Sequence, residues 1–244
     1  RRERAGPSPE GMSSGEYMSP DSYQRFTRAD VTGDSAEEIL VEIDRGRGVE
    51  IRSQDQRIID RVLTTEHLTD LGAIAQKDSA KENLVLYTYP NATRGGTFTV
   101  MSVDRTEIGR WEVHPPPSRF DVGTWQGEPA VFYFQGAALV IRSSVGEVMA
   151  RLQAPLAEKF SRIFVASGYG GRTIVLASGS GYTPYHMVCI YDADGSLAFQ
   201  LIESEHAFRL EADESRPEFF VYARSDKWRF VEGLFQPPMI HPPQ

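Results

Sequence analysis

The sequence lacks the residues on which several classes of protein depend. Its single cysteine, Cys189, excludes an internal disulfide and any metal site built from several cysteines. No apolar run approaches the ~20 residues that a membrane-spanning helix needs, so we expect the chain to be peripheral to a membrane at most. Positive charge is also scarce, because 26 Lys and Arg stand against 34 Asp and Glu, for a formal net charge of −8. An acidic chain of this kind is not expected to bind nucleic acid.

Patterns typical of catalysis are equally scarce. No two of the five histidines lie two to four residues apart, so the sequence has no local zinc motif. The segment Ser178-Gly179-Ser180-Gly181-Tyr182 lacks the Gly-x-Ser-x-Gly pattern of a serine nucleophile between a strand and a helix. No pair of acidic residues is singled out as the two carboxylates of a glycosidase would be. We therefore predict a protein without catalytic residues, without enzymatic activity and without a cofactor.

Both ends of the 244-residue chain are rich in proline and small polar residues. Residues 1–22 and 236–244 show no hydrophobic period, and proline disfavours helix and central strand there. We expect two extended arms, whose candidate partner-binding residues are Met12, Tyr17, Met18, Pro237, Pro238, Met239 and Ile240. The chain begins at Arg1 without an initiator Met, so we expect that a signal or anchor was removed or that the sequence is a fragment.

Short apolar runs between the arms recur at an almost constant spacing. Five apolar anchors lie 43 to 49 residues apart, at Phe26, Leu71, Phe120, Ile163 and Phe208. Each is followed by a second strand, at Ile39–Val41, Leu84–Leu86, Ala130–Phe132, Ile174–Leu176 and Phe219–Val221. Third strands follow at Val49–Ile51, Phe98–Val100, Leu139–Ile141, Val188–Ile190 and Trp228–Phe230. After a polar turn, fourth strands begin in four of the units at Ile58, Ile108, Val148 and Leu197.

Four strands in each repeat of about 45 residues are typical of β-propeller blades, because stacked sheets bury both apolar faces of each blade. We predict an all-β chain whose residues 23–235 form a small propeller of about five four-stranded blades. The expected repeats are 23–69, 70–117, 118–159, 160–206 and 207–235. An irregular β-sandwich, or an open array of the same sheets, remains an alternative.

The fifth repeat shows no fourth strand in the sequence. Residues 17–23 could supply it and so close the ring, although Pro20 limits pairing there. The other interpretation, which we favour, is that both arms lie against partner proteins. Pro-rich segments lose little conformational entropy when they dock.

The segment from Arg28 to Val41, RADVTGDSAEEILV, resembles the FG-GAP/VCBS repeat of integrin-type propellers in a degenerate form. In that family an Asp-rich loop between the first two strands of a blade can hold calcium. The resemblance implies Asp30, Asp34 and Glu38 as candidate calcium ligands, although Thr32 and Ser35 depart from the pattern. The corresponding loops of the other four repeats do not keep it, so calcium is expected only here, if anywhere.

We interpret the chain as a non-catalytic scaffold, an extrinsic accessory subunit that stabilises a larger assembly of other protein subunits. A membrane-associated complex, such as a respiratory or photosynthetic one, is the expected setting. A carbohydrate-binding or carbohydrate-cleaving propeller and a calcium-dependent adhesion module are the alternatives. The family resemblance implies an extracytoplasmic location, periplasmic or extracellular.

Overall fold

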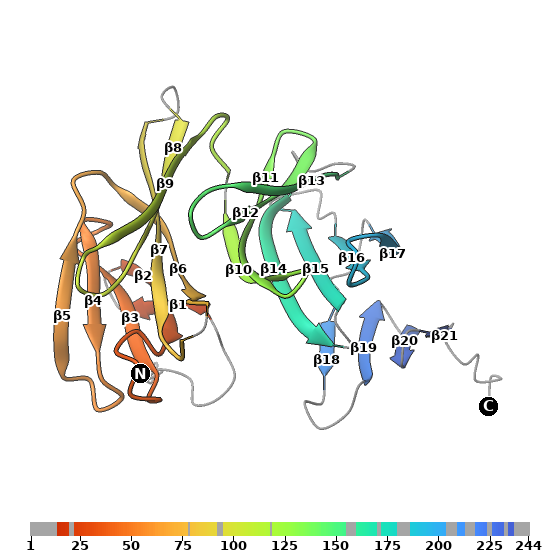
Figure 1. The fold of residues 1–244 in the computed structure, drawn as a ribbon, viewed down its shortest axis with the longest axis horizontal. Coiled ribbons are helices and arrows are strands. Elements are labelled where there is room, and N and C mark those ends of the chain that lie inside the picture. Colours follow the sequence, from red (N-terminus) through yellow and green to blue (C-terminus); the bar gives the residue numbers. More distant parts are fainter. Residues whose placement is uncertain are drawn as a thin grey trace. The chain divides into compact units, whose positions relative to one another are not determined.

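A computed structural model describes most of the chain, namely residues 14–19, 22–77, 79–91, 95–117, 119–154, 160–169, 172–179, 186–203, 209–212, 218–223, 226–231 and 234–236. All regular secondary structure in these residues is β-strand (Figure 1). Within the same residues, no helix has the length and apolar character needed to cross a membrane.

The strands form five sheets, and each sheet follows the order of the sequence. The first consists of β1 (Ser14–Ser19), β2 (Ser22–Ala29), β3 (Glu38–Ile43), β4 (Gly48–Arg52) and β5 (Ile58–Leu63). The second consists of β6 (Leu68–Ala75), β7 (Glu82–Asn91), β8 (Gly95–Met101) and β9 (Glu107–Val113). The third consists of β10 (Phe120–Trp125), β11 (Glu128–Gln135), β12 (Ala138–Ser143) and β13 (Val148–Gln153). The fourth consists of β14 (Phe160–Tyr169), β15 (Arg172–Gly179), β16 (His186–Tyr191) and β17 (Leu197–Glu203). The fifth consists of β18 (Arg209–Ala212), β19 (Glu218–Ala223), β20 (Asp226–Val231) and β21 (Leu234–Gln236).

The predicted second, third and fourth strands all fall within observed strands, whereas the two ends of the chain differ from prediction. The fifth sheet has its own fourth strand, β21, which pairs with β20. The N-terminal arm was expected to lie extended away from the sheets, but β1 pairs antiparallel with β2 along its whole length. The sequence signal for β1 is weak because its only two large apolar residues, Tyr17 and Met18, are adjacent, so the alternation typical of a half-buried strand is absent.

The chain divides into two compact units. One contains Arg1–Pro117, Pro129–Val131 and Ile141–Arg151, and the other contains Ser118–Glu128, Phe132–Val140 and Leu152–Gln244. The first and second sheets belong to the first unit, the fourth and fifth to the second, and the third contributes to both.

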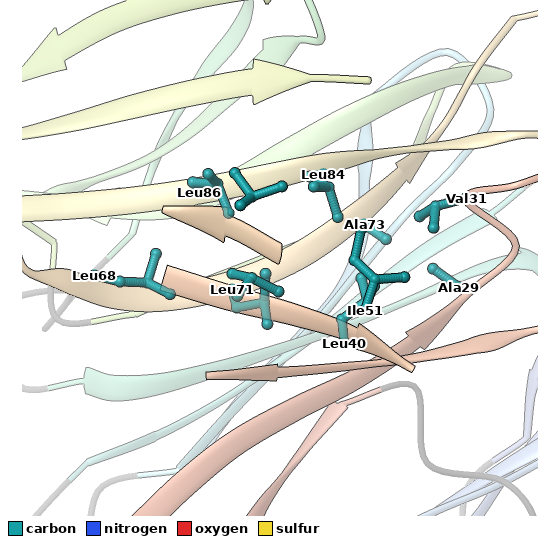
Figure 2. Packing of buried hydrophobic residues seen from close by; sticks show 11 residues of the cluster. Ala29, Val31, Leu40, Ile51, Leu68, Leu71, Ala73, Leu84 and Leu86 are labelled. Atoms are coloured by element: carbon teal, nitrogen blue, oxygen red, sulfur yellow. The ribbon is translucent and has the colours of Figure 1, made fainter. Parts of the chain in front are cut away.

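The core of the first unit lies between the first and second sheets (Figure 2). Side chains alternate between the two faces of a strand, so every second residue of β3, β4 and β5 points to the same side. On the side facing the second sheet, this pattern places buried aliphatic residues, and each Val, Leu or Ile among them contributes about 1.5–3 kcal/mol. The cluster is Ala29, Val31, Leu40, Val49, Ile51, Val62, Leu68, Leu71, Ala73, Leu84 and Leu86.

The opposite face of the first sheet has an apolar inner part and a charged outer part. Phe26, Ile39 and Val41 form a separate buried cluster there. Directly paired residues share a face, so the register continues this face from Val41 to Glu50 on β4 and then to Arg61 on β5.

Four of the sheets end in the same five-residue turn before the last strand. The first residue donates its amide to the fifth residue's carbonyl over 2.9–3.0 Å, from Ser53, Ser102, Ser143 and Asp192. The fourth residue has positive φ in each turn, at Gln56, Arg105, Gly146 and Gly195. A β-bulge follows in the first, second and fourth sheets, which distorts the exposed edge and disfavours pairing with another chain.

In the second unit, polar bonds and aromatic contacts hold the third and fourth sheets together. Asp121 Oδ2 accepts the amide of Val165 over 2.6 Å, and Thr173 Oγ1 donates to the carbonyl of Thr124 over 2.8 Å. The Trp125 and Tyr191 rings meet edge to face with centroids 5.5 Å apart.

Candidate interaction surface

The predicted calcium loop joins β2 to β3, and its carboxylates bond the loop's own amides. Asp30 accepts the amides of Gly33 over 2.6 Å and of Ser35 over 2.9 Å. Asp34 accepts the amide of Ala36 over 2.9 Å. These are turns in which an Asp side chain replaces a backbone acceptor, which is the alternative role that such residues have in loops.

Glu38, the third predicted ligand, is buried and bonded in the same way. One of its oxygens accepts the amides of Val31 and Thr32 over 3.0 and 3.2 Å, and the other accepts the Thr32 hydroxyl over 3.1 Å. Calcium requires six to eight oxygen ligands, whereas here the Glu38 oxygens accept hydrogen bonds from the loop itself. Among the described residues, no three His, Cys, Asp or Glu side chains are grouped to hold a metal ion. Calcium at Asp30, Asp34 and Glu38 therefore stays a prediction.

The same loop is attached to the second sheet through Glu82. The Asp30 amide donates to Glu82 Oε2 over 2.9 Å, and the Glu82 amide donates to the Asp30 carbonyl over 2.8 Å. Burial raises the pKa of Glu82; the Asp30 amide opposes this rise, and the charges of Glu37 and Asp30 add to it. The acidic residues of this loop thus join two sheets.

The predicted partner-binding arms can be compared with the structure only in part. Met12 and the residues Pro237, Pro238, Met239 and Ile240 lie outside the described residues. Tyr17 and Met18 belong to β1, where they pair with Gln24 and Tyr23. The role of the arms in binding stays a prediction.

Two arginines share one buried carboxylate on the outer part of the first sheet, a feature that the sequence analysis missed. Glu50 is only 3% exposed. Arg61 donates to its Oε1 through Nε and Nη2, each over 2.8 Å, while Arg52 donates to its Oε2 through Nε over 2.5 Å. Burial raises the pKa of Glu50, but the hydrogen bonds and charges of the two arginines outweigh it and hold the pKa below its ordinary value.

Exposed aliphatic residues accompany this arginine pair. Leu63 is 72% exposed, and Ile58 and Ile59 are 46% and 43% exposed. All three belong to β5, the last strand of the first sheet (Figure 1). Among the residues whose side-chain exposure the structure describes, seven large apolar side chains are exposed, and the other four are Val145, Val148, Phe164 and Leu197. One six-residue edge strand therefore carries three of the seven.

The register places Arg52, Ile58, Arg61 and Leu63 on one face, and Ile59, which has no partner at the β-bulge, is put on the same side by its spacing of two residues from Arg61. Glu50 pairs with Arg61, Gly48 with Leu63, and Arg52 with Ile58. We call Arg52, Ile58, Ile59, Arg61 and Leu63 the arginine–aliphatic face. A sequence signal for it exists, because residues 45–61 hold five arginines in an acidic chain, but only the register shows which of them meet Glu50.

The second unit contains a serine–histidine pair that the sequence analysis set aside. His186 is buried at the start of β16, and its Nδ1 lies 3.0 Å from Ser178 Oγ on β15. The two residues are direct partners across the strands. A histidine that accepts the serine proton can activate the hydroxyl as a nucleophile, and a serine can equally serve to orient the histidine. Ser178 was predicted to lie outside any nucleophile motif.

Cys189 lies on the same strand and is buried. Burial raises its pKa to about 11, and hydrogen bonds from Tyr191 and Gln200 oppose this rise. A thiol that stays protonated at neutral pH is a poor nucleophile.

No family model matches the sequence, and no curated protein matches it. Solved structures do resemble the fold. Virginiamycin B lyase from Staphylococcus aureus is 9% identical with a TM-score of 0.55, over 92% of this chain and 72% of that chain. BBS1N in complex with ARL6DN, in mercury-soaked crystals, is 10% identical with a TM-score of 0.50, over 89% of this chain and 82% of that chain. A protein of unknown function from Bacteroides caccae is 10% identical with a TM-score of 0.52, over 85% of this chain and 79% of that chain.

The BBS1 domain and the lyase are β-propeller-like proteins. At such low identity the likeness concerns the fold alone. Together with the repeated four-stranded sheets, it confirms the predicted fold class, and the FG-GAP type stays a prediction. The chain is an all-β protein with a small β-propeller fold.

Proposed function

We propose that this chain is a non-catalytic scaffold that binds other protein subunits. The observation that carries the proposal is the arginine–aliphatic face on the outer edge of the first sheet. Large aliphatic side chains exposed together beside arginines are typical of protein interfaces, in which apolar anchors and arginine are enriched. Apolar side chains exposed in this way lower the solubility of a protein unless a partner covers them.

A protein of the same fold supports the proposal. BBS1N is a propeller-like domain that was crystallised in complex with ARL6DN. A propeller presents several strand edges and loops around a rigid framework, and this suits it to partner binding. Membership of a larger membrane-associated complex, such as a respiratory or photosynthetic one, stays a prediction, as does the extracytoplasmic location.

Native purification tests the proposal. The full chain, tagged at its chromosomal locus, should elute from size exclusion in a complex with at least one protein in stoichiometric amount. Light scattering gives the mass, and mass spectrometry gives the composition. A chain that elutes as a monomer with no stoichiometric partner would contradict the scaffold function.

The serine–histidine pair favours a second candidate function, a hydrolytic propeller. The Ser178 hydroxyl would be the nucleophile and His186 would accept its proton. On the scaffold proposal, a screen of ester and glycan substrates stays flat. Turnover that is lost in Ser178→Ala and in His186→Gln would favour the hydrolase instead. Turnover lost on a single Asp or Glu substitution would favour the carbohydrate-cleaving alternative.

A further inference from the structure

We propose that the arginine–aliphatic face binds an acidic, extended segment of a partner protein, with the two guanidinium groups contacting its carboxylates and Ile58, Ile59 and Leu63 contacting its apolar side chains. This inference rests on the scaffold function proposed above and names the partner's chemistry.

The geometry of the arginine pair prepares it to bind a carboxylate. Glu50 bonds Arg52 with one oxygen and Arg61 with the other, so both side chains are positioned before any ligand arrives. One carboxylate between two guanidinium groups leaves one surplus positive charge. A guanidinium has five N–H donors, and Arg61 directs two donor atoms to Glu50 while remaining 57% exposed. The remaining N–H groups can donate to a second carboxylate, and little entropy is lost because Glu50 has already ordered the arginine.

The charge around the arginine pair is locally positive. On the face itself, Arg52 and Arg61 stand over the single carboxylate of Glu50, a surplus of one positive charge in a chain of net charge −8. A short acidic segment responds to this local surplus, because charges beyond the Debye length of ~8 Å are screened at physiological salt. Nucleic acid and an anionic membrane would meet the whole acidic chain and be repelled. The face therefore suits a short acidic stretch better than a polyanion.

The exposed aliphatic residues of the face indicate that its ligand is a peptide. Leu63 and Arg61 point to the same side of β5, and their partners on β4 are Gly48, which has no side chain, and Glu50. A carboxylate held by the arginines brings the neighbouring side chains of its segment over Leu63 and Ile58. Apolar groups of the partner would be buried there, and this adds binding free energy that a phosphate group alone would not supply.

The edge of β5 restricts the binding mode to side chains. A β-bulge lies between the residues that pair with Ile51 and Arg52. Arg105 from the next sheet donates to the Arg61 carbonyl and to Asp60, each over 3.2 Å. Both features hinder the addition of another strand, so we expect contact across the face and not along the edge.

A library of short random peptides tests the inference when it is selected against the full folded chain. Enriched peptides should combine at least two acidic residues with aliphatic ones. In fluorescence anisotropy, Arg61→Gln and Leu63→Glu should each weaken the binding of such a peptide by about tenfold, or about 1.4 kcal/mol. The matched control is Arg110→Gln, because Arg110 also lies on an outer strand, is 58% exposed and pairs with Glu107 over 3.9 Å. Its binding should equal that of the original chain.

Several outcomes would overturn the inference. Enrichment of neutral or basic peptides would overturn it. An equal loss of peptide affinity in the control Arg110→Gln would also do so. The same holds if the chain binds an oligonucleotide or anionic vesicles and Arg61→Gln abolishes that binding. Far-UV circular dichroism and thermal melting check that each variant folds, and a large loss of Tm in Leu63→Glu would show that the chain itself covers this face. If the native complex persists in Arg61→Gln and Leu63→Glu, the inference fails while the scaffold function stands. If no native complex exists, the scaffold function fails.

Discussion

At the level of single residues, Glu50 lies beneath two arginines and holds its charge although it is buried. A buried carboxylate is costly unless it is paired and hydrogen-bonded, and here both of its oxygens are occupied. The arrangement explains how an acidic chain can display a locally positive surface.

Removal of this carboxylate should destabilise the fold in a pH-dependent way. Glu50→Gln is expected to lower the free energy of unfolding by about 1–2 kcal/mol near neutral pH, a reduced value because the arginines are partly exposed. Since the folded-state pKa of Glu50 is lowered, its contribution is complete above the ordinary pKa of a glutamate and is lost as the pH falls through the lowered folded-state value. Urea denaturation at neutral pH and at about pH 3 measures both effects. Glu107→Gln, on the exposed pair with Arg110, is the control and should change little; an equal loss in both variants would contradict this account.

Gly146 is one of two glycines in the shared outer turn, with Gly195, at which a side chain would meet a tryptophan ring. Its φ is +90°, and a Cβ atom there would lie 2.8 Å from Trp111 Cε3. Gly146→Ala should therefore cost about 2–3 kcal/mol, from backbone strain and from the clash together. Gly136→Ala is the control, because its φ is +57° and nothing lies within 4 Å, so only strain of about 1 kcal/mol is expected. Thermal melting of the two variants measures the difference, and a similar loss of Tm in both would show that the contact with Trp111 is unimportant.

At the level of elements, the loop between β2 and β3 is closed by its own hydrogen bonds. Asp30 and Glu38 bond backbone amides, so their oxygens are occupied without a cation. We expect the Tm to be the same in calcium and in a chelator. A bound cation would stabilise the fold by mass action, so a clear drop of Tm in chelator would show that calcium holds this loop.

Strand β1 is the element whose removal should matter least. Within the described residues each of the other four sheets has four strands, so β2 can end its sheet as their first strands do. A chain without residues 1–20 should keep its β-sheet circular dichroism spectrum and lose at most a few degrees in Tm. If the shortened chain instead melts without cooperativity, β1 is required for the fold. A folded shortened chain that loses its partner would support the predicted role of the N-terminal arm.

At the level of the whole molecule, the repeats revealed the architecture more fully than the functional surface. The apolar runs that contain Ile39, Leu84 and Val188 form middle strands, which are buried on both faces. Their continuous apolar character and their repeat spacing of about 45 residues were therefore enough to locate these strands in the sequence. β21 has only three residues, and in β1 the two large apolar residues, Tyr17 and Met18, are adjacent, so neither strand shows an alternating pattern. The meeting of Glu50 with Arg61 depends on strand register, which local sequence does not specify.

The candidate sites differ in how readily the sequence reveals them, and strand register is again the reason. The acidic loop at Asp30 was found because its residues are close in sequence, yet the folded loop uses them for its own turns. Ser178 and His186 lie on neighbouring strands, and Arg52 and Arg61 meet across a hairpin. Sites assembled across strands become visible only when the pairing is known.

Site-specific photo-crosslinking in the native cell tests most directly the central claim that this propeller binds proteins through its first sheet. A photoreactive amino acid at Leu63 should give a discrete adduct with a partner protein, and the linked peptide should be rich in Asp and Glu beside aliphatic residues. The control position is Glu112, which is exposed on β9 away from the arginine–aliphatic face and should give no such adduct. No adduct at Leu63, or the same adduct from both positions, would contradict the account.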